Sequence, residues 1–175
     1  MGTRGVAETS GRTSGGRTAL VAAPGAAYDP SVTVENEEEL AAIVRAAGVV
    51  AVIGVKDGSD PHAPAYSIPK MLQERGIRIV PVHPTLTSAL GERAYQAIGD
   101  VPERVDIVDL FRRPDAIGAH ADEILALPEP RRPGVVWMQT GIRNDAAAAR
   151  LEAAGIRVVQ DHCLGVYAAR YRPKV

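Results

Sequence analysis

The sequence first offers chemistry in a basic loop that follows a short apolar run. Residues 51–68 read AVIGVKDGSDPHAPAYSI, which combines an apolar run, a glycine, a polar loop and the expected first turn of a helix. Gly54 leaves room for a ligand to reach the backbone, and Lys56 adds a point charge suited to phosphate. Ser67 or Tyr66 is expected at the helix start, where free N–H groups favour an anion. The loop therefore predicts a phosphate site; the alternative is a tight turn with a solvated lysine.

The kind of nucleotide follows from what this loop and the next one lack. The dinucleotide fingerprint is G-x-G-x-x-G, but after Gly54 the next glycine is Gly58. An NAD site also places Asp or Glu about 20 residues further on, where it binds the ribose hydroxyls. That region here reads PVHP, with His83 and no acid. A ribose with an additional phosphate is not repelled there, which favours CoA or NADP over NAD. The alternative is that His83 is a solvated loop residue.

Two later loops add polar groups that could face the same ligand. In FRRPD, Arg112 and Arg113 precede a predicted helix, and arginine can bind phosphate through two parallel hydrogen bonds. We expect at least one of the two to be a plain surface charge. The loop WMQTGIRND offers Gln139, Thr140, Gly141, Arg143 and a capping Asn144, after a strand whose Trp137 we expect in the core.

Residue patterns typical of catalysis are scarce. The four histidines, at positions 62, 83, 120 and 162, show no metal-binding spacing, and no G-x-S-x-G motif is present. His162 and Cys163 are neighbours in the sequence, which suggests a nucleophile and its base. Adjacent residues on a strand point to opposite faces, however, so the preferred interpretation is a buried, inert Cys163.

Alternating elements must position these loops. Asn36 can cap a helix that begins with three glutamates and ends at Gly48. Short, wholly apolar runs, typical of strands buried on both faces of a parallel sheet, alternate with helical patterns. We predict strands over 49–54, 77–82, 105–111, 135–139 and 156–160, and helices over about 66–75, 114–127, 144–154 and 163–171. This order predicts an open, three-layer α/β sheet. Ligands bind such sheets beyond the carboxyl ends of the strands, where the strand order reverses.

Composition limits the classes of protein that remain. The chain has 175 residues and a formal net charge of −1, which offers no field to attract nucleic acid or an anionic membrane. Cys163 is the only cysteine, which fits a reducing cytoplasm. We predict a flexible tail over 1–30, because Gly, Ser, Thr and Arg dominate it, and one domain over 31–175. The tail also has some features of an organelle transit peptide, but its glycines interrupt any amphipathic helix.

Together, these segments resemble the small CoA-binding domain proteins. The similarity covers about residues 37–171 and rests on VAVIGVKDG, PAYSIPKMLQERGIRIVPVHP, LGERAYQAIGDVPERVDIVDLFRRPD and VVWMQTGIRNDAAAARLEAAGIRVVQDHC. The family's Rossmann-like fold also occurs in the N-terminal domain of the succinyl-CoA synthetase α subunit and in ADP-forming acyl-CoA synthetases. The resemblance implies a five-stranded parallel sheet of order 3-2-1-4-5, with CoA across the strand ends.

The resemblance also implies which residues hold the ligand. The diphosphate would be held by Gly54, Val55, Lys56 and Ser67. The adenosine would lie along Pro81, Val82, His83 and Pro84, and the cleft would be completed by Phe111, Arg112, Gln139, Gly141 and Ile142. This chain departs from the family in two places, since His83 replaces the usual Asn and Lys56 replaces a frequent serine.

We therefore expect non-catalytic binding of CoA or an acyl-CoA, with NADP as the less favoured cofactor. The larger synthetases carry a further domain with a phosphorylated histidine, for which 175 residues leave no room. One alternative is an NADP- or CoA-dependent enzyme that uses Cys163 or His162. Another is a regulatory, nucleotide-sensing subunit of a larger complex. Pairing as a homodimer or with a partner enzyme is compatible with each of these functions.

Overall fold

The five predicted strands form one parallel sheet in the computed structural model, which describes residues 34–175. The predicted tail, 1–30, lies outside the described residues. The strands of the sheet are β1 (Val49–Ile53), β2 (Arg78–Val82), β5 (Ile107–Leu110), β6 (Val135–Met138) and β7 (Arg157–Val159). They are almost wholly buried, as expected for a parallel sheet covered on both faces.

The strand order is β2-β1-β5-β6-β7, with every neighbouring pair parallel. Beyond β2, Tyr95 makes an isolated parallel bridge to Val82. It does so through Tyr95 N–H to the Pro81 carbonyl (2.9 Å) and His83 N–H to the Tyr95 carbonyl (2.8 Å). When this segment is counted as the third strand, the order reads 3-2-1-4-5-6, which contains the predicted 3-2-1-4-5 pattern. At the opposite edge, Val34 N–H donates to the Val158 carbonyl of β7 at 2.9 Å.

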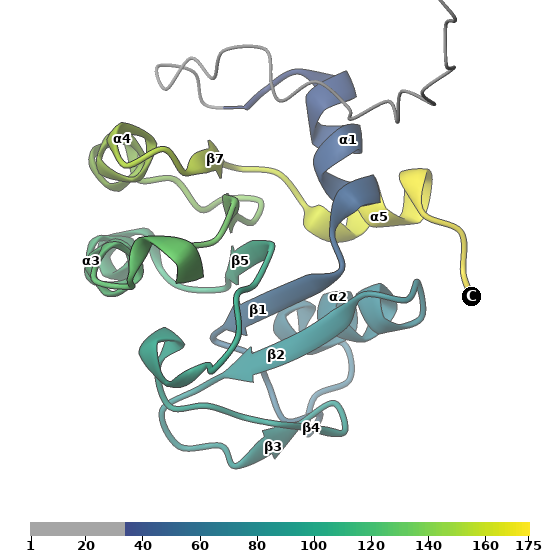
Figure 1. Cartoon of the computed structure of the whole chain (residues 1–175). Helices are drawn as coiled ribbons and strands as arrows, with labels where there is room; N and C mark the ends of the chain where they lie inside the picture. The colour runs from purple at the N-terminus through teal and green to yellow at the C-terminus, as the bar shows by residue number, and fades with distance from the viewer. Residues whose placement is uncertain (1–33) are drawn as a thin grey trace, which may run out of the picture.

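Helices cover both faces of the sheet (Figure 1). The helices α1 (Glu37–Ala46), α2 (Pro64–Gln73) and α5 (Leu164–Tyr171) pack on one face, and α3 (Ile117–Leu125) and α4 (Asp145–Ala153) pack on the other. The buried apolar residues form two clusters, one on each face of the sheet, and no residue belongs to both. The predicted three-layer, Rossmann-like α/β fold is confirmed.

Two predicted helix caps are confirmed. The side-chain oxygen of Asn36 accepts from Glu38 N–H at 2.9 Å, and that of Asn144 accepts from Ala147 N–H at 3.0 Å. These bonds satisfy amides that have no partner within the helix. They fix where α1 and α4 begin, and α4 follows directly on one of the candidate binding loops.

Three local features differ from the predictions. The helix expected from about Tyr66 begins at Pro64, because proline suits the first helical position. The helix expected over 114–127 is divided into a 3₁₀ turn, η2 (Pro114–Ala116), and α3. Between β2 and β5, an unpredicted hairpin joins β3 (Ser88–Ala89) and β4 (Glu92–Arg93). Its turn residues, Leu90 and Gly91, have φ values of 57° and 79°, the left-handed pair typical of a two-residue hairpin. Two further 3₁₀ turns are η1 (Ile98–Asp100) and η3 (Glu129–Arg131).

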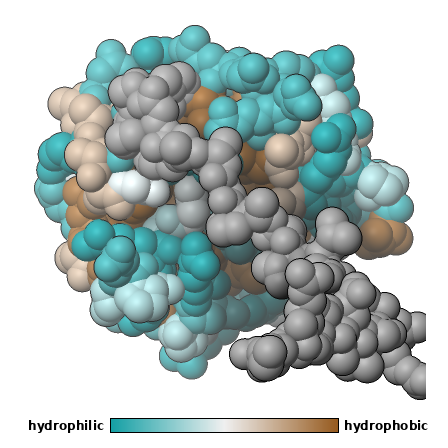
Figure 2. All heavy atoms as spheres, turned by 45° about the horizontal axis from the view of Figure 1, so that its top comes forward, coloured by the Kyte–Doolittle hydropathy of each residue, from teal (hydrophilic) through white to brown (hydrophobic). Residues whose placement is uncertain are grey.

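On the face drawn in Figure 2, most of the described residues in view are hydrophilic, and apolar residues lie in smaller areas between them. Val166 and Val175 are the large apolar residues exposed within residues 34–175. In that part of the chain, every helix is too short or too polar to cross a bilayer.

Candidate functional site

A crevice opens at the carboxyl edge of the sheet where the chain leaves two neighbouring strands in opposite directions. β1 leads to α2 on one face, and β5 leads to α3 on the other, so the strand order reverses between them. Gly54 ends β1 with φ at 89°, and a Cβ atom there would lie 2.5 Å from the Phe111 carbonyl oxygen. Only glycine therefore lets the loops after β1 and β5 come this close.

Three basic side chains meet around this crevice. One hollow of about 210 Å³ is lined by Val55, Lys56 and His83 together with Asp57, Ser59 and Leu86. A second hollow, of about 200 Å³, is lined by Gly54, Val82, His83, Pro84 and Arg112 together with Ile53, Gln96, Ala97, His120 and Glu123. Because His83 borders both, it connects the two hollows. Burial lowers the pKa of His83, and the positive charges of Lys56 and Arg112 lower it further, which places these three groups in one electrostatic neighbourhood.

The ring of His83 is oriented by its own turn. His83 Nδ1 accepts from Thr85 N–H and from Leu86 N–H, each at 3.3 Å. An asparagine oxygen makes the same kind of turn, so His83 holds this loop as an asparagine at the same position would. With Nδ1 acting as the acceptor, the neutral ring carries its proton on Nε2. That N–H is a donor for a ligand atom.

The two arginines after β5 have different surroundings. Arg113 pairs with Asp115, and their side chains are 83% and 63% exposed. Arg112 is half-buried and lines the hollow beside Gly54 as well as a third hollow, of about 360 Å³, bordered by Phe111. Arg113 also borders this third hollow, but it is the more exposed of the two arginines and is paired with Asp115, as expected of a surface charge.

The first loop offers fewer backbone donors than predicted. Gly54 N–H donates to the Val82 carbonyl at 3.0 Å and Lys56 N–H to the Ala65 carbonyl at 3.1 Å. Within residues 34–175, the amide of Val55 has no acceptor. Ser67, expected at the helix start, lies one turn inside α2, where its N–H donates to the Ala63 carbonyl at 2.9 Å. Lys56 is exposed and brings its side chain to the crevice, whereas Val55 borders the same hollow with no exposed surface.

The remaining candidates do not line these three hollows. Pro81 is buried within β2. Gln139 is also buried, and its amide group points into the protein: Nε2 donates to both Asp109 carboxylate oxygens, at 2.9 and 3.0 Å, and Oε1 accepts from Leu164 N–H at 3.2 Å. Gly141 N–H donates to Asp161 Oδ1 at 2.6 Å, and the Ile142 carbonyl accepts from Asp161 N–H at 3.2 Å.

Sequence reasoning missed a buried carboxyl group beside the site. Asp109 lies in β5 with no exposed surface, and burial raises its pKa to about 7. The available signal was an acid inside the apolar run VDIVDLF, because acids are rarely buried without a partner. His120 and Glu123 of α3 were also missed. They form a pair, with His120 Nδ1 3.3 Å from Glu123 Oε2, and border the hollow next to Arg112.

The neighbouring His162 and Cys163 hold the loop after β7 in different ways. His162 Nδ1 lies 2.6 Å from the Gln160 carbonyl, and its own carbonyl accepts from the indole N–H of Trp137 at 2.7 Å. Trp137 is fully buried, which confirms its predicted place in the core. Cys163 is half-buried, whereas the sequence favoured burial, because it sits at the turn that starts α5. No hydrogen bond joins the two side chains in the described part of the chain.

The chain is similar to proteins of one family. Residues 48–169 match the profile of a family described as CoA binding domain. The uncharacterized protein YneT of Bacillus subtilis is 31% identical over 131 residues, which cover 75% of this chain and 93% of YneT. A solved structure from Thermus thermophilus, cell-free ID.343, is 41% identical with a TM-score of 0.71, and the match covers 78% of this chain and 98% of that one.

A fold likeness extends to a much larger protein. The dinucleotide-forming acetyl-coenzyme A synthetase 1 of Ca. Korarchaeum cryptofilum is 21% identical with a TM-score of 0.54, over 63% of this chain and 25% of that chain. At that identity the match shows the shared fold alone. The family match supports CoA binding in general.

Proposed function

Because the chain belongs to the CoA binding domain family, we propose that it binds coenzyme A or an acyl-CoA, without catalysis, at the carboxyl edge of the sheet. The observation that carries this proposal is the meeting of Lys56, His83 and Arg112 around Gly54. CoA carries a diphosphate and a phosphate on its ribose, so it needs several cations near a bare stretch of backbone.

We assign the parts of the ligand to the loops in chain order. The diphosphate lies along Gly54, Val55 and Lys56, with the exposed Lys56 side chain as its cation and Ser67 of α2 as a further contact. The adenosine lies along the loop after β2, where Nε2–H of His83 faces a phosphate oxygen. Arg112 serves both parts, because it borders the same hollow as Gly54 and His83.

The rest of the ligand runs over the ends of β5 and β6. Phe111, Gly141 and Ile142 form that part of the proposed cleft. Gln139 contributes its backbone only, since its side-chain amide is engaged with Asp109 and Leu164. We further propose that residues 31–175 form the binding domain and that the protein works in the cytoplasm, where its lone Cys163 stays reduced.

One observation favours a second candidate, a thiol-dependent enzyme. Cys163 is partly exposed in the loop between β7 and α5, at the same edge of the sheet. Replacing Cys163 with serine separates the two functions. A binding protein keeps its affinity for CoA in this variant, whereas a thiol-dependent activity on a CoA thioester is lost.

Calorimetric titration with CoA, dephospho-CoA, NADP and NAD tests the proposal. We expect CoA to bind most tightly, dephospho-CoA to bind about tenfold more weakly for loss of one phosphate contact, and NAD to give no measurable heat. The Arg112→Gln variant should lose affinity for CoA, and the matched Arg113→Gln variant should keep it. No heat with CoA, or tighter binding of NADP than of CoA, would overturn the proposal.

A further inference from the structure

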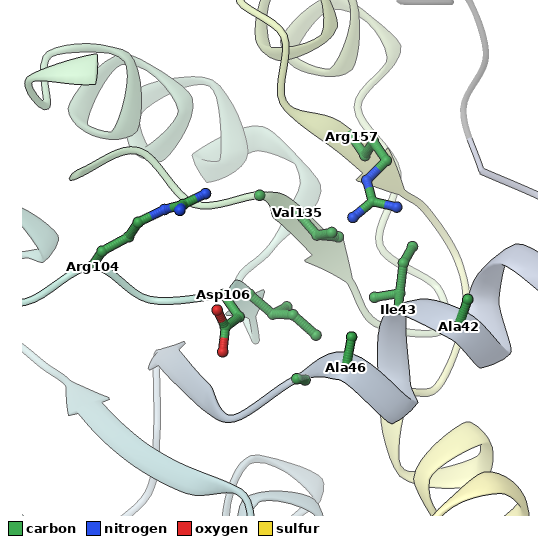
Figure 3. Close-up of a pocket in the computed structure, with 10 residues that line it drawn as sticks. Ala42, Ile43, Ala46, Arg104, Asp106, Val135 and Arg157 are labelled. Carbon is green, nitrogen blue, oxygen red and sulfur yellow. The ribbon is translucent and has the colours of Figure 1, made fainter. Parts of the chain in front are cut away.

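A separate hollow of about 340 Å³ lies at the opposite, amino edge of the sheet. It is bounded by the last turns of α1, by the segment leading into β5, and by the first residues of β6 and β7. Figure 3 shows Arg104 and Arg157 reaching toward it from opposite sides, with Asp106 between them. Val135 begins β6 in this hollow, whereas Gln139, at the other end of the same strand, belongs to the proposed CoA cleft.

The charges around this hollow are unevenly neutralised. Asp106 Oδ2 accepts from Gly48 N–H at 2.8 Å and from Val49 N–H at 2.9 Å, so backbone donors already stabilise this carboxylate. Among the described residues, the guanidinium of Arg157 has one long ionic contact, 3.8 Å between its Nη1 and Oε1 of Glu39. Within residues 34–175, Arg104 uses Nε alone, which donates to the Arg132 carbonyl at 3.2 Å. Two guanidinium groups therefore keep donors for an incoming anion.

The wall between the arginines is apolar. Ala42 and Ala46 are exposed on α1, and Ile43 and Val135 close the hollow behind them. Two alanines one turn apart leave room for a few methylene groups beside the helix. A ligand that fits both the wall and the arginines is negatively charged at one end and apolar at the other.

We propose that this hollow binds a short-chain aliphatic carboxylate, with its carboxylate on the guanidinium group of Arg157, its alkyl chain along Ala42 and Ala46, and the positive charge of Arg104 attracting the anion from the opposite side. Arginine holds a carboxylate through paired, charge-assisted hydrogen bonds. Inorganic phosphate would satisfy the same donors but would gain nothing from the apolar wall. An amine would be repelled by the two guanidinium groups. This site is independent of CoA, because it lies at the other edge of the sheet.

Sodium butyrate is the probe for this site, added to the ¹⁵N-labelled full chain at constant ionic strength with sodium chloride as the blank. We expect saturable shifts of the amide signals of Ala42, Ile43, Ala46 and Val135. Arg157→Gln should weaken butyrate binding about tenfold, as expected for loss of one charge-assisted pair. Ala42→Phe, which fills the hollow without removing charge, should weaken it as well. Arg150→Gln removes a charge outside the hollow and serves as the matched control.

Each outcome decides the proposal. Saturable butyrate shifts at the named amides, lost in Arg157→Gln and kept in Arg150→Gln, support it. It is overturned if butyrate gives no saturable shift, if phosphate binds as tightly as butyrate, or if Ala42→Phe binds butyrate normally while remaining folded by its spectrum. CoA titration of Arg157→Gln should match the parent chain, so failure of this site is distinguishable from failure of the CoA site.

Discussion

Both edges of the sheet carry arginine, but the side chains around the arginines differ between the two edges. At the carboxyl edge, Lys56, His83 and Arg112 surround Gly54, a buried glycine against which the Phe111 carbonyl packs closely. At the amino edge, Arg104 and Arg157 stand apart, on either side of an apolar helix face. Because of this difference, we expect the two edges to bind different kinds of anion. Clustered cations around a glycine favour phosphates, whereas separated guanidinium groups beside methyl groups favour an organic acid.

Two aspartates, one just before β5 and one within it, also differ in their surroundings. Asp106 meets backbone N–H groups at the amino edge, while Asp109, three positions along, is wholly buried with Gln139 as its side-chain partner. The first carboxylate holds two chain segments together. Ionisation of the second, Asp109, lowers the stability of the folded chain, because a buried charge has lost its hydration.

The largest expected effect comes from adding a side chain to Gly54 at the carboxyl edge of the sheet. Gly54→Ala would force a Cβ against the Phe111 carbonyl, at 2.5 Å in the present backbone, at a residue with φ of 89°. We expect a loss of about 3 kcal/mol or more in the free energy of unfolding and no measurable CoA binding. Urea unfolding and calorimetry measure both.

Gly141→Ala is the control for that prediction. Gly141 has a similar φ, 78°, but its Cβ would meet nothing within 4 Å, so we expect a loss of only about 1 kcal/mol from backbone conformation. Equal losses in the two variants would show that the close approach to Phe111 does not matter.

The next effect tests the buried acid between the edges. Burial raises the pKa of Asp109 from 3.8 to about 7, so the folded chain holds a proton that the unfolded chain has lost across that range. The contribution of Asp109 to stability is therefore full below about pH 4 and falls as the pH rises through about 7. Relative to Asp109→Asn, the parent chain should lose about 2 to 3 kcal/mol of unfolding free energy between pH 5 and pH 8.

Urea unfolding of both chains at the two pH values checks this prediction. A constant difference between the parent and Asp109→Asn from pH 5 to pH 8 would contradict the buried-charge account.

A smaller effect distinguishes the arginines of the two edges. Arg112→Gln should weaken CoA binding about tenfold by loss of a charge-assisted bond and leave butyrate binding unchanged. Arg157→Gln should do the reverse. Calorimetry with CoA and amide-shift titration with butyrate, run on both variants, measure this crossed pattern. If one substitution weakened both ligands, the two edges would not be independent.

The smallest effect concerns the protonation of His83. In the free protein, burial and then the charges of Lys56 and Arg112 lower its pKa. Bound phosphate adds negative charge and raises the pKa again, so binding takes up protons and CoA affinity should increase as the pH falls from about 8 to 6. We expect a change of about two- to fivefold. Calorimetry across that pH range measures it.

His83→Asn keeps an acceptor for the turn and removes the titrating ring. Its CoA affinity should vary less with pH than that of the parent chain. The residual slope reports the phosphate groups of the ligand, whose second pKa is about 6. An identical slope in both chains would exclude His83 as the source of the proton uptake.

The sheet and its helices were predictable from the sequence because their signals are local. Apolar runs gave the five strands, and the Asn36 and Asn144 caps marked two helix starts. The β3–β4 hairpin was missed because its strands are only two residues long. Ser67 lies one turn inside α2, and not at its start, because Pro64 begins the helix two residues before Tyr66.

The site was only partly predictable, because side-chain directions depend on distant residues. The alternation of strands and helices was enough to place Lys56, His83 and Arg112 at one edge. The direction of Gln139 was not predictable, since it depends on Asp109, 30 positions away in the sequence. Arg104 and Arg157 have no shared motif, and only the fold brings them to one hollow.

The backbone hydrogen bonds between Tyr95 and the outer edge of β2 limit how copies of this protein can associate. An open strand edge is a template for pairing with another chain, and such pairing leads to aggregation. Here Tyr95 occupies the Pro81 carbonyl and the His83 amide, proline itself offers no N–H, and Val34 occupies the Val158 carbonyl at the far edge. An incoming strand would first have to displace these residues, so the fold resists growth into a continuous intermolecular sheet and leaves association to its helices and loops.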